Sequence, residues 1–292
     1  MIAIAPRDLA LLLTITLAWG LNLIVSKVGV QEMPPLLFTA LRMAIVAVLL
    51  APLLRVRSGQ MSALAVASVL GGGLHLGLSM AGLRIAENVS SVAIASQLSI
   101  PFTTLLCVAL LGETVRWRRW TGILLAFSGV FIMGFDPQIG SRWQSLALVI
   151  AGAFVGSLGT IAVKKLSGFK PLELQAWFAC MSLPILLVLS IQLEQPDLAG
   201  LADVTWRGWG ALAYTALIAS MFAHTVYFHL LQRYPVTSVA PLSTLAPVFS
   251  VIFGVTLLGD QLSARIIIGG ACTLIGVLII MLRERRIVDI GT

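Results

Sequence analysis

The side chains that could do chemistry in this chain lie inside apolar runs. Two histidines, two amides and several hydroxyl and aromatic groups interrupt hydrophobic stretches at helical spacing. A polar side chain surrounded by hydrocarbon must face protein or water, so this spacing indicates which face of each helix turns inward. The residues predicted to line a cavity for a small solute are Trp19, Asn22, His75, Ser79, Gln97, His224, Tyr227 and Ser243.

The stripe in the first apolar run shows the pattern, because Trp19, Asn22 and Ser26 follow one another at i, i+3 and i+7. A serine or threonine in such a run is often bonded to its own backbone, so one hydroxyl alone says little. For His75 and His224 the alternative is a packed, neutral histidine.

Catalytic and metal-binding patterns are missing from the sequence. None of the 12 acidic residues lies in the middle of an apolar run, and no metal-ligand cluster, nucleophile–base motif or phosphate loop is present. We therefore expect no enzyme, no cofactor and no bound metal. A proton relay through a membrane carboxylate has no candidate, so we expect movement of the solute down its own gradient.

Two prolines and one arginine lie within apolar runs. Pro101 and Pro247 remove the helical bonds to the carbonyls of Gln97 and Ser243, which predicts free acceptors for an ammonium group or water. The alternative is a simple kink. Arg42 lies about 10 Å into its run by helical rise. We expect Arg42 to snorkel or to bond helix-end carbonyls, in preference to contacting solute.

Composition places the whole chain in a membrane. The 292 residues are 59% hydrophobic and 11% charged, with a mean hydropathy of +1.01, whereas soluble domains carry about 25% charge. The net charge of +7 comes from basic residues between apolar runs, which is typical of topology signals and excludes nucleic acid as a partner. The ten predicted spans are Asp8–Val28, Pro35–Leu54, Ser62–Leu83, Val89–Leu111, Trp117–Phe135, Trp143–Val163, Pro171–Ile191, Trp206–Leu230, Val236–Leu258 and Ala264–Leu282.

An internal duplication organises these spans. Ser91–Met133 and Ser238–Ile280 align at an offset of 147 residues with 15 of 43 positions identical. Lys27 and Pro34 match Lys164 and Pro171 at an offset of 137. The sequence therefore predicts an all-α protein built from two five-helix repeats, residues 8–135 and 143–282.

The distribution of basic residues predicts the orientation. Thirteen Lys and Arg residues lie on the face that holds both termini, and five lie on the other. The basic face is expected to be cytoplasmic. Because each copy has an odd number of spans, the second copy should enter the membrane inverted, with a solute site between the halves.

The chain resembles the EamA family of the drug/metabolite transporter superfamily. The resemblance covers residues 8–282 and rests on Trp19-Gly20, on Pro34 followed by Arg42, and on Leu111-Gly112-Glu113. It is similar to bacterial amino-acid exporters, including those of the YddG type. The resemblance implies a bacterial inner-membrane exporter with a central cavity lined by spans one, three, four, six, eight and nine. The second copy departs from the first, because Gly156 replaces Trp19 and no arginine matches Arg42.

The favoured hypothesis is export of amino acids, aromatic or of broad range, or of similar small zwitterionic metabolites by alternating access. A wall rich in hydroxyls, amides and aromatic rings suits such a solute, whereas phosphate requires clustered Arg or Lys. Exporters of drugs or nucleoside-like metabolites are the nearest alternative, and a non-transporting membrane enzyme or scaffold is the alternative of another class. The expected partners are the small-molecule substrate and membrane lipid, and the expected assembly is a monomer or homodimer.

Overall fold

The computed structural model describes residues 5–137, 142–197, 199–234, 239 and 242–288, with side chains described up to residue 282. Helices are the only regular secondary structure in this part of the chain. The α-helices are α1 (Pro6–Glu32), α2 (Pro35–Leu50), α3 (Met61–Ser68), α4 (His75–Ile85), α5 (Val89–Ser96), α6 (Ser99–Leu111), α7 (Trp117–Gly134), α9 (Trp143–Val163), α10 (Pro171–Leu189), α11 (Trp206–Ala213), α12 (Ala223–Arg233), α14 (Ala246–Leu258) and α15 (Ala264–Val288).

Eight helical stretches in the described residues are long and apolar enough to cross a bilayer. Of the other two predicted spans, the fifth forms α7, and the ninth contains α14 in the part that the structure describes. Two arginines in the first turn of α7 lower its mean hydropathy, and only the last 13 residues of the ninth predicted span form α14. The prediction of an all-helical, multi-pass membrane protein is confirmed. The eight stretches are Pro6–Glu32, Pro35–Leu53, Met61–Ile85, Val89–Leu111, Trp143–Val163, Pro171–Glu194, Trp206–Arg233 and Ala264–Leu282.

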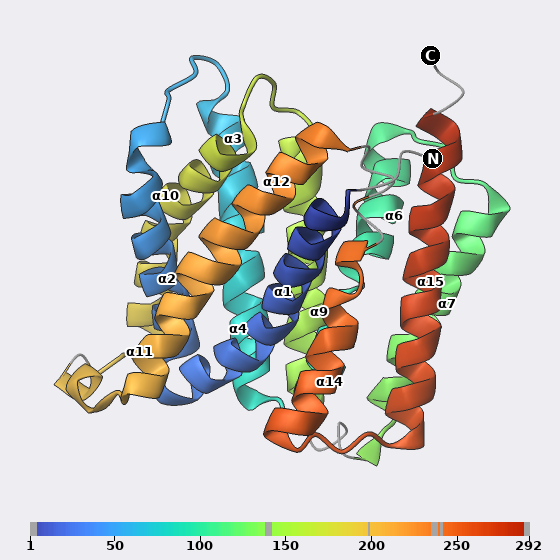
Figure 1. Cartoon of the computed structure of the whole chain (residues 1–292). Coiled ribbons are helices and arrows are strands. Elements are labelled where there is room, and N and C mark those ends of the chain that lie inside the picture. The colour runs from blue at the N-terminus through green and yellow to red at the C-terminus, as the bar shows by residue number, and fades with distance from the viewer. Residues whose placement is uncertain (1–4, 138–141, 198, 235–238, 240–241, 289–292) are drawn as a thin grey trace.

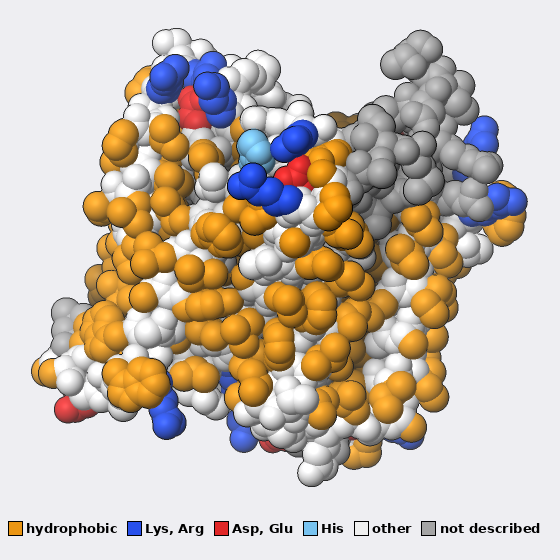
Figure 2. Space-filling view, in the orientation of Figure 1, with side chains coloured by type: hydrophobic (Ala, Val, Ile, Leu, Met, Phe, Trp, Pro, Cys, Tyr) orange, Lys and Arg blue, Asp and Glu red, His pale blue; other side chains and the backbone are white. Residues whose placement is uncertain are grey.

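The helices form one bundle with its charges at the two ends. The start of α1 and the end of α15 lie at the same end, whereas α9 starts at the opposite end (Figure 1). Apolar side chains cover the middle of the visible face, and Lys and Arg gather above and below it (Figure 2). The outward Phe131 and Trp206 are 69% and 80% exposed, as expected for side chains that meet lipid or its interface.

Irregular helix geometry recurs at duplicated positions. α5 and α6 are separated by a break at Gln97–Leu98, and a turn at Thr244–Leu245, 147 residues later, precedes α14. The backbone also forms π-helices at Val69–Leu74 and Tyr214–Phe222, which overlap at the same offset. Such π segments leave carbonyls available to side chains and often mark functional sites.

One expectation about these breaks is wrong. The Gln97 carbonyl is not free, because it accepts a bond of 3.1 Å from the Ile100 N–H. Pro101 has no N–H to donate to this carbonyl, and the backbone instead forms a tighter turn in which the Ile100 N–H is the donor. The Gln97 carbonyl is thus no candidate for an ammonium group.

Close packing of α7 on α15 holds two duplicated helices together. Gly122 faces the Gly276 carbonyl, and Gly129 faces the Gly269 carbonyl. At the 147-residue offset Gly122 corresponds to Gly269, and Gly129 corresponds to Gly276. Each glycine therefore contacts the counterpart of the other glycine on its own helix. Thr273 donates a 3.3 Å bond to the carbonyl of Ala126, its own counterpart. Small residues at such a crossing let two backbones approach.

Replacing Gly276 with alanine should lower the thermal stability of the purified protein in detergent. The added Cβ would lie 2.5 Å from the Gly122 carbonyl oxygen, and overpacking of this kind costs about 1–3 kcal/mol. Gly210→Ala is the control, because a Cβ there meets nothing within 4 Å. Equal melting temperatures for the two variants would contradict this account of the crossing.

Candidate functional site

An aromatic cluster joins the first and second halves of the chain. The indole ring of Trp19 on α1 lies with its centroid 5.3 Å from the ring of His224 and 5.3 Å from that of Tyr227, both on α12. The Tyr227 and Ser243 side chains are hydrogen-bonded. The structure therefore brings together four of the eight residues that the sequence singled out, from three separate segments.

The π segment before α12 provides the acceptor that fixes this cluster. The Ala219 carbonyl accepts from Trp19 Nε1 at 3.2 Å and from His224 Nδ1 at 2.9 Å. A carbonyl oxygen only accepts, so Nδ1 of His224 carries the hydrogen and Nε2 is left as an acceptor. The cluster thus keeps a polar atom available beside two aromatic rings.

His75 and Ser79 form a second group, where α4 packs on α9. His75 Nδ1 donates to the Gly152 carbonyl at 2.7 Å. A Cβ added at Gly156 would lie 2.7 Å from that same Nδ1, and one at Gly152 would lie 2.8 Å from Ser79 Oγ. The imidazole thus fills the volume that a larger residue at position 156 would need, which explains why this counterpart of Trp19 is a glycine.

The two predicted amides have different surroundings. Asn22 lies one turn after Trp19 on α1, and its buried Oδ1 has no hydrogen-bond partner among the described residues. Gln97 is half-buried and ends α5 at the helix break. An unpaired buried acceptor costs free energy unless a ligand or water satisfies it, so Asn22 remains a candidate contact.

A pocket of about 500 Å³ surrounds Arg42, between α2, the π segments, α10 and α12. Arg42 is 8% exposed and donates through Nε and Nη2 to Ser220 Oγ, at 3.0 and 2.8 Å. The expectation that Arg42 snorkels or bonds helix-end carbonyls is therefore wrong. His224 is the one predicted site residue in this pocket lining.

The pocket also contains a residue that the sequence analysis missed. Gln175 donates through Nε2 to the Ser220 carbonyl at 2.7 Å, and its Oε1 is buried without a partner among the described residues. The signal was present, because Gln175 is the sole amide in the first five turns of the seventh span. Ala179, which corresponds to Arg42 at the 137-residue offset, also lines the pocket. Because alanine is much smaller than arginine, the second repeat leaves space there for the pocket.

A second, basic pocket of about 340 Å³ adjoins the first, beside the start of α10 and the last turns of α12. Pro171 and Phe228 line both. Arg55, Arg57 and Lys170 belong to its lining. Arg57 pairs with Glu173 at 3.1 Å, and this hydrogen bond raises the pKa of Arg57 above its usual value.

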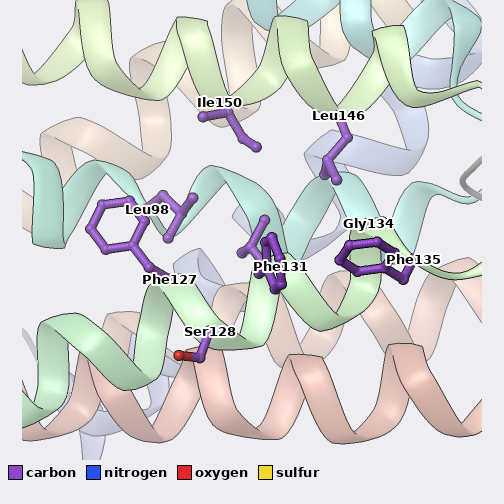
Figure 3. A pocket seen from close by; sticks show the side chains of 9 residues that line it. Leu98, Phe127, Ser128, Phe131, Gly134, Phe135, Leu146 and Ile150 are labelled. Carbon is purple, nitrogen blue, oxygen red and sulfur yellow. The ribbon is translucent and has the colours of Figure 1, made fainter.

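A larger groove of about 590 Å³ is a lipid-facing surface rather than a polar site. It lies between the break after α5, α7 and α9, and Ser128 is the one hydroxyl among its described lining residues (Figure 3). Phe131 and Phe135 at its edge are 69% and 62% exposed. Its apolar character and open edge suit acyl chains, and it includes none of the predicted site residues.

The two ends of the bundle differ in how they are closed. At the lower end in Figure 1, Lys27 Nζ donates to the carbonyls of Leu83, Arg84 and Ala86 at 2.9, 2.9 and 2.6 Å. Asp260 there accepts from the N–H of Ser90 at 2.7 Å and from its hydroxyl at 2.6 Å.

Lys164, the counterpart of Lys27, lies at the other end and makes different bonds. It donates to Cys107 Sγ at 3.1 Å and to Glu113 at 3.0 Å. These hydrogen bonds raise the pKa of Lys164. Its side chain is 45% exposed, whereas Lys27 is 7% exposed. The bundle is therefore packed more closely around Lys27 at one end than around Lys164 at the other.

Similarity to curated proteins extends over the whole chain. Two relatives named "Probable amino-acid metabolite efflux pump" are 27% identical in Salmonella typhimurium, over 94% of each chain, and 29% identical in Escherichia coli K12, over 98% of this chain and 99% of the relative. The "Uncharacterized inner membrane transporter YedA" of Escherichia coli K12 is 25% identical over 86% of this chain and 83% of its own.

A solved crystal structure supports the fold. It superimposes with a TM-score of 0.63 and 18% sequence identity over 96% of this chain and 98% of its own. The EamA-like transporter family matches residues 8–135 and 142–282, as the resemblance in the sequence had suggested. The chain therefore belongs to the EamA-like transporter family of the drug/metabolite transporter superfamily and is a membrane transporter, not an enzyme.

Proposed function

We propose that the protein exports amino acids, or similar small zwitterionic metabolites, across a bacterial inner membrane. Transport proceeds by alternating access between two inverted repeats, residues 8–135 and 143–282, with both termini in the cytoplasm. The names of the two efflux-pump relatives support the substrate class. The inner-membrane relative supports the location.

The observation that carries this proposal is the cluster of Trp19, His224 and Tyr227 at the junction of the two halves. Its residues lie within long apolar helical stretches, offer aromatic faces and hydrogen-bonding groups, and include no fixed charge. A solute with both charges and an apolar or aromatic body is well matched to such a wall.

The unequal ends support alternating access. Lys27 closes one end by binding three carbonyls, while Lys164 is half-exposed and paired with Glu113 at the other. In an inverted repeat, two counterparts exchange environments when the transporter changes its open side. The structure would then correspond to a state closed outside and accessible from the cytoplasm through the basic pocket.

Exporters of drugs or nucleoside-like metabolites are the second candidate, because an aromatic cluster also stacks planar rings. Counterflow into proteoliposomes separates the two candidates. Vesicles preloaded with unlabelled solute are given labelled amino acids, nucleosides or a lipophilic cation in turn. The proposal requires accumulation of amino acids, and accumulation of the other solutes alone would contradict it.

Replacing Trp19 with alanine should slow amino-acid counterflow about threefold to tenfold while leaving folded protein in the membrane. The change removes an aromatic face from the cluster, and the loss of one aromatic contact to the solute is worth about 0.5–1.5 kcal/mol. Trp117→Ala is the control, because Trp117 is 68% exposed at the start of α7. Unchanged counterflow in Trp19→Ala would show that the cluster is a packing surface.

Reporter fusions test the orientation. A fusion after Arg286 should report the cytoplasm, and an insertion within Gln192–Thr205 should report the outside, because the thirteen-to-five excess of basic residues marks the cytoplasmic face. Both reporters on one side would contradict the inverted topology.

A further inference from the structure

The buried charge of Arg42 has no counter-ion among the described residues. The ion pairs there are Arg57–Glu173, Arg142–Glu87, Lys164–Glu113 and Arg233–Asp8, and Arg42 belongs to none of them. Its hydrogen bonds go to the neutral Ser220 hydroxyl. A cation that is 92% buried without an anion is costly, and a ligand that supplies an anion would remove that cost.

A second group bonded to Ser220, the side-chain amide of Gln175, has an unpaired acceptor oxygen among the described residues. Ser220 accepts from Arg42 through its hydroxyl and from Gln175 through its carbonyl. The second amide atom of Gln175, Oε1, is buried and free among the described residues. Ser220 therefore holds in place both the Arg42 guanidinium, which has no anionic partner among the described residues, and the Gln175 amide, whose oxygen has no donor there.

We propose that Arg42, Ser220 and Gln175 form a receptor for the α-carboxylate and α-ammonium groups of an amino acid with an apolar side chain. The assignment deepens the proposed function and rests on it. The guanidinium binds the carboxylate by charge-assisted hydrogen bonds. Gln175 Oε1 accepts from the ammonium group, which pairs both charges of the zwitterion with the two unused groups of the pocket.

The rest of the pocket selects the side chain. Leu76, Phe178 and Phe228 line it together with other apolar residues, and its volume of about 500 Å³ falls within the range of small-ligand sites. No carboxylate is among the described residues that line it, so a second cationic group would have no partner there. Apolar amino acids fit this wall, and basic or acidic side chains would lose their hydration without a partner.

The adjoining basic pocket gives the carboxylate a route from the cytoplasm. Arg55, Arg57 and Lys170 line this pocket with the single carboxylate Glu173 among its described lining residues, so positive charge is in excess. Pro171 and Phe228 line both this pocket and the Arg42 pocket. Clustered positive charge raises the local concentration of an approaching anion. A fatty acid from the membrane carries the same carboxylate chemistry, so the experiment includes both sources.

Binding of tritiated L-leucine to the purified protein in phosphatidylcholine nanodiscs tests the site. Unlabelled leucine should compete at least tenfold better than leucine methyl ester, which lacks the carboxylate, and than 4-methylpentanoate, which lacks the ammonium group. This arm needs no variant. Equal competition by all three compounds would overturn the proposal, and so would displacement of leucine by dodecanoate at lower concentration than by leucine itself.

Variants then locate the site. Arg42→Gln should weaken leucine binding at least tenfold, Arg42→Lys should weaken it less because the charge remains, and Gln175→Leu should narrow the advantage of leucine over 4-methylpentanoate. Arg119→Gln is the matched control, because Arg119 is also 8% exposed but lies on α7 outside the pocket. Wild-type affinity in Arg42→Gln would overturn the proposal.

Transport separates this inference from the proposed function. If proteoliposomes with the unchanged protein accumulate leucine and those with Arg42→Gln accumulate it equally fast, the exporter proposal stands. The Arg42 site is then ruled out. Proteoliposomes that accumulate none of the amino acids would overturn the proposed function, and the receptor with it. We expect leucine accumulation that falls in parallel with affinity across the Arg42 variants.

Discussion

The absence of water in the hydrocarbon core governs the polar interior of this protein. Each polar side chain within a span must find its partner inside the protein, and regular helices have already used their carbonyls. The π segment Tyr214–Phe222 relieves this shortage. Its carbonyls at Thr215, Ala219 and Ser220 accept from Ser220, Trp19 and Gln175 respectively. One distorted stretch of backbone therefore organises both the aromatic cluster and the buried arginine.

The duplication provides the frame, and departures from it provide the sites. Helix breaks, π segments and glycine crossings recur at fixed offsets. Yet Trp19 is matched by Gly156, and Arg42 is matched by Ala179. In each pair the smaller residue leaves room. The His75 ring fills the space beside Gly156, and the space beside Ala179 is part of the pocket. An asymmetric ligand requires such inequality, because a perfectly repeated wall would present each group twice.

Much of this architecture was predictable from the sequence. Hydropathy indicated helical spans, because a bilayer imposes their length. The spacing of polar residues within each span indicated the inward faces that carry Trp19 in one helix and His224 and Tyr227 in another. The partner of Arg42 was not predictable, because the Ser220 hydroxyl reaches it only through the distorted backbone of the π segment and the contact of that segment with α2. The Gln97 carbonyl failed as a candidate for a related reason, since a local turn supplied a donor that helical periodicity does not show.

The contact of α7 with α15 has a consequence for substitutions in the two halves. Because Gly122 meets the counterpart of Gly129, and Gly129 meets the counterpart of Gly122, the contact is its own complement. Two identical five-helix units that carried this surface would fit each other through it, because each unit offers the groups that the other needs. Substitutions on this face are therefore constrained in both halves at once, whereas the opposite faces of the two helices can diverge independently.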